Sequence, residues 1–213
     1  MFTYDNPVVN FMTKFWHLML LTFYWFLCCI PIVTIGPATA SMYRVAAKVI
    51  KKEDGTVTRD FFSFFSKNLK SGIKLTLLHL LLLALLGIFF GGCFLMEEGT
   101  FIRRLYLAFG LVLAVVFLAM SCHLYPLFSR FEYEKTIHYF KSSFWLCFRH
   151  PIKTFQLLLY PTLLSLLLPL SPVALVLYPS VTAYASVLVL EPVLKQYMVK
   201  PEGEEDDETW YWT

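Results

Sequence analysis

The chain has 213 residues, of which 58% are hydrophobic, 18% aromatic and only 15% charged, and its mean hydropathy is +0.62. These values exclude an ordinary soluble globular domain and are typical of a helical membrane protein. The net charge of +3 says little about nucleic acid, which we do not expect as a partner; the positions of the basic residues are more informative.

Several apolar runs approach or reach the length of about 20 residues that a helix needs to cross a membrane. They cover residues 15–35, 75–96, 105–128, 154–170 and 173–190. The last two are short and are joined by the prolines of LPLSP (168–172), so we interpret them as a helical hairpin, with one long kinked helix as the alternative. The sequence thus predicts an all-α, polytopic transmembrane bundle of about five spans.

This bundle is predicted to form a single domain over residues 1–200, followed by an acidic cytoplasmic tail over 201–213. The acidic run of the tail predicts disorder. Its final aromatic residues (210–212) leave open the alternative that the tail docks on a partner or on the bilayer surface.

Basic residues gather on one side of the predicted bundle. Fifteen of the eighteen lysines and arginines lie between the first two spans, between the third and fourth, or after the fifth; the exceptions are Lys14, Arg103 and Arg104. Because cytoplasmic loops retain positive charge, the sequence predicts an outside N-terminus and a cytoplasmic C-terminus.

The segment WFLCCIPIVTIGPAT (25–39), at the end of the first span, contains residues that interrupt a helix. Pro31 cannot donate a backbone hydrogen bond, Gly36 allows a turn, and Pro37 suits the first position of a new helix. We therefore predict a bend here, which either serves packing alone or docks a partner protein.

An amphipathic cytoplasmic connector is predicted over RDFFSFFSKNLKSGIKL (59–75), because its phenylalanines share one helical face and its lysines the other. The aromatic face suits the inner headgroup layer of a membrane and equally suits packing against the spans. A similar pattern recurs 79 residues later in FKSSFWLCFRHPIK (140–153) and predicts a second connector. Either the first four spans form a parallel tandem repeat, with spans 1–2 related to spans 3–4, or the similarity is due to chance.

Sequence motifs for chemistry are not evident. The five cysteines form no CxxC pair, and His17, His79 and His123 are not at metal-ligand spacing. No span carries a central carboxylate or lysine, although Glu191 lies near the inner end of the fifth. We therefore expect no enzyme, no cofactor, no metal and no ion-coupled pump. Separately, the small-residue spacing GIFFG (87–91) permits close helix contact and leaves a homo-oligomer possible.

One combination of residues resembles a known family. Trp25, Pro31, Thr34, Gly36, Pro37 and Thr39, followed by Phe61, Phe65 and Asn68 in FFSFFSKNL, resemble the YesL family of small bacterial membrane proteins of unknown function. The similarity extends over nearly the whole chain and is most specific in PIVTIGPAT (31–39), while Thr22 stands where asparagine is expected. The resemblance implies the plasma membrane of Gram-positive bacteria and a link to carbohydrate uptake, without established catalytic residues.

We therefore expect a non-enzymatic accessory or regulatory subunit that contacts the lipid bilayer and the subunits of a carbohydrate transporter. A small transporter or substrate-capturing membrane component is the alternative, and an intramembrane enzyme comes third. A polar cavity between the spans would favour the transporter. The candidate structural or interaction residues are Trp25, Pro31, Thr34, Gly36, Pro37, Thr39, Phe61, Phe65, Asn68, Phe140 and Phe144.

Overall fold

The computed structural model describes residues 7–51, 55–94, 100–166 and 172–198, and within them the chain is helical with short connections. Its α-helices are α1 (Pro7–Cys28), α2 (Ile35–Val45), α3 (Val57–Phe94), α4 (Phe101–Arg130), α5 (Thr136–Arg149), α6 (Pro151–Ser165) and α7 (Pro172–Leu194). A 3₁₀ turn (Ile32–Thr34) precedes α2, a π-helical turn (Ala46–Lys51) follows it, and a second 3₁₀ turn (Lys195–Tyr197) follows α7. The predicted all-α class is confirmed.

Within the described ranges, three helical segments are long and apolar enough to cross a membrane: Val57–Cys93, Phe101–Arg130 and Val176–Tyr197. They agree with the second, third and fifth predicted spans. Helix α6 has 15 residues and is therefore about 22 Å long, which is less than the roughly 30 Å of a hydrocarbon core. The count of five spans and the tandem repeat stay predictions, and the predicted tail lies outside the described residues.

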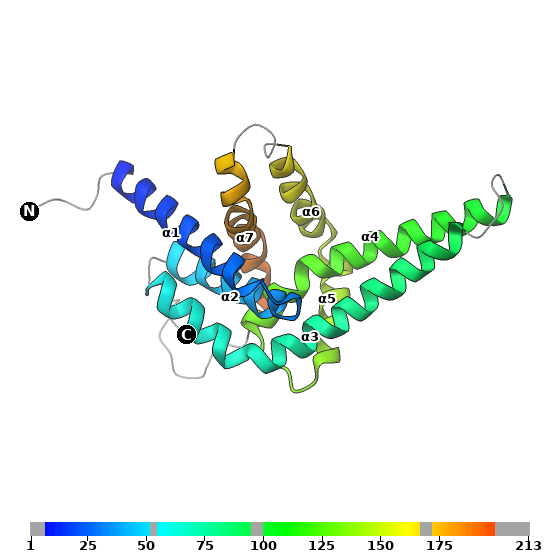
Figure 1. Cartoon of the computed structure of the whole chain (residues 1–213), viewed down its shortest axis with the longest axis horizontal. Coiled ribbons are helices and arrows are strands. Elements are labelled where there is room, and N and C mark those ends of the chain that lie inside the picture. Colours follow the sequence, from blue (N-terminus) through cyan, green and yellow to red (C-terminus); the bar gives the residue numbers. More distant parts are fainter. Residues whose placement is uncertain (1–6, 52–54, 95–99, 167–171, 199–213) are drawn as a thin grey trace, which may run out of the picture.

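The helices diverge toward one side of the molecule and converge on the other (Figure 1). The start of α1, the end of α6 with the start of α7, and the end of α3 with the start of α4 lie on the diverging side. Helix α2, the first half of α3 and helix α5 lie where the other helices converge. This arrangement separates the predicted outer ends of the spans from the segments predicted to be cytoplasmic.

Helix α2 forms the centre of the core, because it contacts α1, α3, α4 and α7. Its small side chains allow this: a Cβ atom at Gly36 would overlap Thr76 Oγ1, and one at Gly72 of α3 would lie only 2.7 Å from Pro37 Cβ. Such distances leave no room for a side chain at either glycine. The two helices therefore pack backbone against backbone, as small residues permit in membrane proteins. The buried residues of α2 are Gly36, Pro37, Ala38, Ala40, Ser41, Met42, Tyr43 and Val45.

Helix α3 is continuous over 38 residues and joins the predicted connector to the predicted second span. The sequence analysis treated these two segments as separate elements. That prediction was wrong, because one helix runs through both. Lys74 marks a change in polarity along one helix, and the backbone continues through it without a break. The first half of α3 is thus held rigidly by the same hydrogen-bonded helix that forms the span.

Candidate functional site

The bend predicted after the first span is stabilised by side chains of the segment itself. Helix α1 ends at Cys28, and Thr34 Oγ1 lies 2.6 Å from the carbonyl oxygens of both Cys28 and Pro31. Trp25 Nε1 donates a hydrogen bond of 3.1 Å to Thr39 Oγ1, which ties α1 to α2. Helix α2 begins two residues before the predicted Pro37, which is tolerated because first-turn N–H groups have no intrahelical partner.

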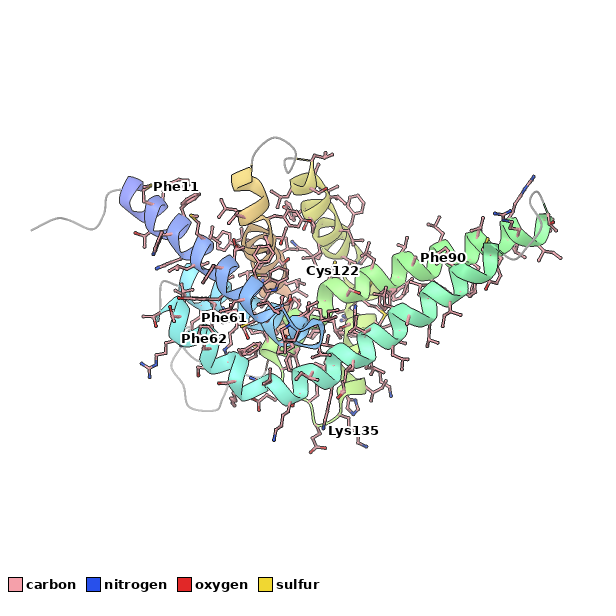
Figure 2. All side chains as sticks on the ribbon, in the orientation of Figure 1. Phe11, Phe61, Phe62, Phe90, Cys122 and Lys135 are labelled. Atoms are coloured by element: carbon pink, nitrogen blue, oxygen red, sulfur yellow. The ribbon has the colours of Figure 1, made fainter. Side chains whose placement is uncertain are left out.

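The predicted aromatic connector packs largely on the bundle. Phe61 is fully buried, its ring centroid lies 6.0 Å from that of Tyr24 of α1, and Phe65 stacks on it at 6.2 Å. Phe62 remains 38% exposed (Figure 2). Asn68 Nδ2 donates to the carbonyl of Phe64 in its own helix, so this amide makes a local contact. The residues of this connector are therefore explained by packing of α3 against α1 and α2.

Helix α5 keeps an exposed aromatic face. Phe140 is buried, but Phe144 and Trp145 are each 48% exposed and Phe148 is 59% exposed. The Arg149 guanidinium lies over the Trp145 ring, with Cζ 5.0 Å from the centroid, which is a cation–π geometry. The two candidates that the sequence placed on this helix thus have different surroundings: Phe140 packs against the bundle, whereas Phe144 is half exposed on the outer surface.

A buried ion pair joins α4 to α7 where the helices converge. Arg130 Nε and Nη2 donate to Glu191 Oε1 at 3.0 and 2.9 Å, and the two side chains are only 3% and 2% exposed. Sequence reasoning noted both residues separately and missed their contact. The available signal was a carboxylate in an apolar segment, which requires a partner.

Arg44 of α2 extends this charged cluster. Its Nη1 donates to the carbonyl of Ser129 at 3.1 Å, and its guanidinium carbon lies 5.1 Å from the centre of the Phe64 ring. Burial lowers the pKa of Arg44 from its ordinary value, and the positive charge of Arg130 lowers it further. The carboxylates of Asp60, Glu132 and Glu191 act in the opposite direction.

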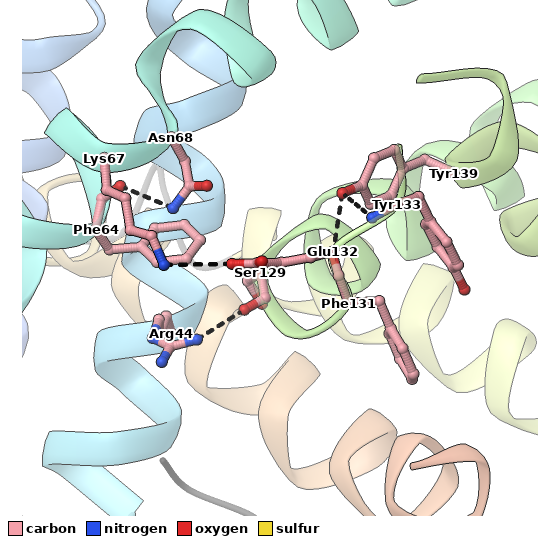
Figure 3. A network of polar contacts seen from close by, with 9 residues as sticks. All are labelled: Arg44, Phe64, Lys67, Asn68, Ser129, Phe131, Glu132, Tyr133 and Tyr139. Atoms are coloured by element: carbon pink, nitrogen blue, oxygen red, sulfur yellow. Dashed lines mark hydrogen bonds and ion pairs between the residues drawn. The ribbon is translucent and has the colours of Figure 1, made fainter. Parts of the chain in front are cut away.

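Further polar contacts connect the segments on this side (Figure 3). Lys67 of α3 lies 3.3 Å from Glu132, an exposed pair that holds the link after α4 near α3. The Tyr139 hydroxyl donates to the Phe131 carbonyl and accepts from the Tyr133 N–H, each at 3.0 Å. Burial raises the pKa of Tyr139, so this hydroxyl stays protonated and able to donate. The contacts fix the start of α5 to the link after α4 and join that link to the first half of α3.

A small cavity of about 180 Å³ lies among α2, α4, α6 and α7. Hydroxyl groups and tyrosine rings dominate its polar lining, and none of its lining residues is charged. The hydroxyl-bearing residues are Thr39, Tyr43, Ser121, Tyr125, Tyr178, Thr182 and Ser186. We call this space the hydroxyl cavity; most of its exposed lining is carbon, and its serine and threonine hydroxyls donate to backbone carbonyls of their own helices, which leaves them as hydrogen-bond acceptors.

A larger cavity of about 370 Å³ lies between α3 and α4, and we call it the α3–α4 cleft. Its walls are leucine, valine, methionine and phenylalanine side chains, and its polar residues are His79 and Ser121. His79 Nε2 lies 3.4 Å from Ser121 Oγ, and the imidazole centroid lies 4.9 Å from that of Phe117 and 6.4 Å from that of Phe140. Ser121 lines both cavities.

The described residues contain no group of three or more metal-ligating side chains. His123 Nε2 contacts Thr154 Oγ1 at 2.9 Å and thereby links α4 to α6, as a buried polar group requires. Burial raises the pKa of the Cys147 thiol, which makes it a weaker nucleophile at neutral pH.

Comparison with known proteins gives one family match. Residues 18–90 match a family described as "Protein of unknown function, DUF624". The matched segment contains the second half of α1, all of α2 and most of α3, including Trp25, Gly36 and Phe61. No curated protein and no solved structure matches the chain significantly.

Proposed function

We propose that this chain is a non-enzymatic accessory or regulatory subunit of a membrane transport system. The observation that carries the proposal is the exposed aromatic face of α5, formed by Phe144, Trp145 and Phe148. Aromatic side chains beside an arginine are typical of the central contacts of protein interfaces. The face is also rigid, because Tyr139 and the buried Phe140 fix α5 against the bundle.

We further propose that the system takes up oligosaccharides across a bacterial plasma membrane, with α5 on the cytoplasmic side and the start of α1 outside. The resemblance of Trp25–Thr39 and Phe61–Asn68 to the YesL family supports the carbohydrate link. The orientation is supported by the basic residues of the segments around α2 and α5, and by their position away from the diverging ends of the helices (Figure 1).

Photocrosslinking in the native organism tests the docking face. A photoreactive phenylalanine derivative at position 144 or 148 is expected to crosslink to a subunit of a sugar transporter. The matched control is the same derivative at Ile88, which is 71% exposed but lies on the α3–α4 hairpin. Equal crosslinking to the transporter from position 88, or none from α5, would show that α5 is not the docking face.

Growth of a deletion strain tests the biological role. The strain is expected to lose growth on a particular oligosaccharide and to keep growth on its constituent monosaccharides. A Trp145→Ala, Phe148→Ala double variant that reaches the membrane at the normal level should reproduce this defect. If the purified chain alone moves a sugar into liposomes, the accessory function is contradicted.

A small transporter or substrate-capturing component is the second candidate, and the hydroxyl cavity favours it. Its uncharged hydroxyls and tyrosine rings match the groups that bind sugars by hydrogen bonds and by contact with ring faces. This candidate predicts saturable sugar binding to the purified chain, weakened by Thr182→Val. Ile88→Val, on the exposed side of α3, is the control that should bind normally.

A further inference from the structure

The α3–α4 cleft opens where a membrane would supply lipid chains. It lies between two segments that are long and apolar enough to cross a membrane, Val57–Cys93 and Phe101–Arg130. Leu85, which lines the cleft, is itself 53% exposed, so the cleft reaches the outer surface of the hairpin. Molecules that enter from this side at this depth are apolar chains.

The shape of the cleft fits an extended chain. It runs from His79 to Phe89 along α3, and ten residues of helix correspond to about 15 Å. Its volume of about 370 Å³ is more than twice the roughly 150 Å³ of an apolar cavity that holds benzene. The space is therefore suited to a chain of many methylene groups packed against leucine and phenylalanine side chains.

The polar end of the cleft indicates the chemistry of the head group. Ser121 Oγ donates its proton to the Phe117 carbonyl at 2.7 Å, so toward a ligand it acts as a hydrogen-bond acceptor. An acceptor at this position selects a ligand that carries a donor, such as a hydroxyl group. Among the residues that the structure describes, no lysine, arginine, aspartate or glutamate lines the cleft or the hydroxyl cavity, so these residues offer a charged head group no counter-charge.

The orientation of the cleft also matches that of a membrane lipid. His79 lies five residues after Lys74, which is exposed, and this spacing corresponds to about 7.5 Å along the helix. The polar end therefore lies near the basic side of α3, where lipid head groups would be expected. The apolar part of the cleft extends away from it along the hairpin.

We propose that the α3–α4 cleft binds the chain of an uncharged, hydroxyl-bearing lipid, with the head group at His79 and Ser121 beside the hydroxyl cavity. The proposal assigns a ligand to a site distinct from the exposed aromatic face of α5, although the buried Phe140 of the same helix lines the cleft. The proposal depends on the second candidate function in one respect only: Ser121 lines both the α3–α4 cleft and the hydroxyl cavity.

Photoaffinity labelling of the full chain in nanodiscs tests this site. The probe is a monoacylglycerol with a diazirine in its acyl chain, and labelled peptides from 79–89 and 113–124 are expected. Val116→Trp fills the cleft and should reduce labelling about tenfold. Val115→Trp places the same side chain on the exposed surface next to it and should label normally. Equal labelling of the two variants would overturn the proposal.

Competition distinguishes the head group from the chain. Unlabelled monooleoylglycerol should displace the probe, whereas methyl oleate and phosphatidylglycerol should not at the same concentration. Ser121→Ala leaves the apolar walls in place and should abolish the preference for monooleoylglycerol over methyl oleate, which provides a test if Val116→Trp does not fold. Displacement by phosphatidylglycerol as efficient as by monooleoylglycerol would overturn the assignment of an uncharged lipid.

Crosslinking from position 144 to the transporter should be the same in the Val116→Trp variant as in the original protein. Failure of the lipid site is therefore distinguishable from failure of the docking face.

Discussion

Neutralising Glu191 should strongly destabilise the protein. Glu191→Gln preserves the shape of the side chain and removes its charge, which leaves the Arg130 guanidinium, 3% exposed, without its closest carboxylate. Removal of one partner from a buried ion pair costs about 3–5 kcal/mol. At about 2–4 °C per kcal/mol for a chain of this size, the midpoint of thermal unfolding should fall by about 6–20 °C.

The measurement is thermal unfolding of the purified protein in detergent, followed by tryptophan fluorescence. The matched control is Glu132→Gln, because the Lys67–Glu132 pair is 73% and 84% exposed and such pairs contribute about 1 kcal/mol or less. The double variant Arg130→Met, Glu191→Leu should recover most of the loss, since an apolar pair avoids the desolvation of both charges. A folded Glu191→Gln variant with the midpoint of the original protein would refute the reasoning.

Further expectations concern packing and topology. Gly36→Ala should destabilise the protein by about 1–3 kcal/mol, because the added Cβ would overlap α3. Gly87→Ala has open space around its Cβ and should stabilise the protein by up to about 1 kcal/mol. Equal thermal midpoints of the two variants would contradict this contrast. Phe61→Ala should lower the free energy of unfolding by about 3–5 kcal/mol in the same assay, because Phe61 is fully buried. Phe62→Ala, at a partly exposed position, should lower it clearly less. A larger loss at Phe62 would argue against the packing of the connector. A cysteine in place of Lys135, with the native cysteines replaced, should react with an impermeant thiol reagent only after the cells are permeabilised; labelling of intact cells would reverse the proposed orientation.

The helical segments could be predicted because hydrophobicity and proline positions are local properties of the sequence. The central part of α4 and the start of α7 at Pro172 follow directly from them, while the rest of the hairpin turn predicted at LPLSP lies outside the described residues. The ends of α3 could not be inferred in the same way. The lysines at 67–74 report where polarity changes, whereas a helix ends only where the backbone loses its hydrogen bonds.

The candidate site depended on contacts that are distant in sequence. The bend at Trp25–Thr39 could be inferred because its residues lie close together in the chain, but the hydrogen bond between the indole and the Thr39 hydroxyl required the structure. Arg130 and Glu191 lie 61 residues apart, and no periodicity connects them. The cavities also could not be predicted, because their walls come from several helices and their volumes depend on side-chain packing.

The Arg130–Glu191 pair also has a consequence for synthesis of the chain. The ribosome produces Arg130 61 residues before Glu191, so at about 5–20 residues per second the arginine exists for about 3–12 s before its carboxylate partner is made. During this interval α4 carries at its end a guanidinium that will later be enclosed. Helix α7 in turn carries a carboxylate that is costly to place in lipid alone. Membrane integration of the last helix should therefore depend on the earlier presence of α4. In a nascent chain with Arg130→Leu, α7 should leave the membrane more readily than in the original chain.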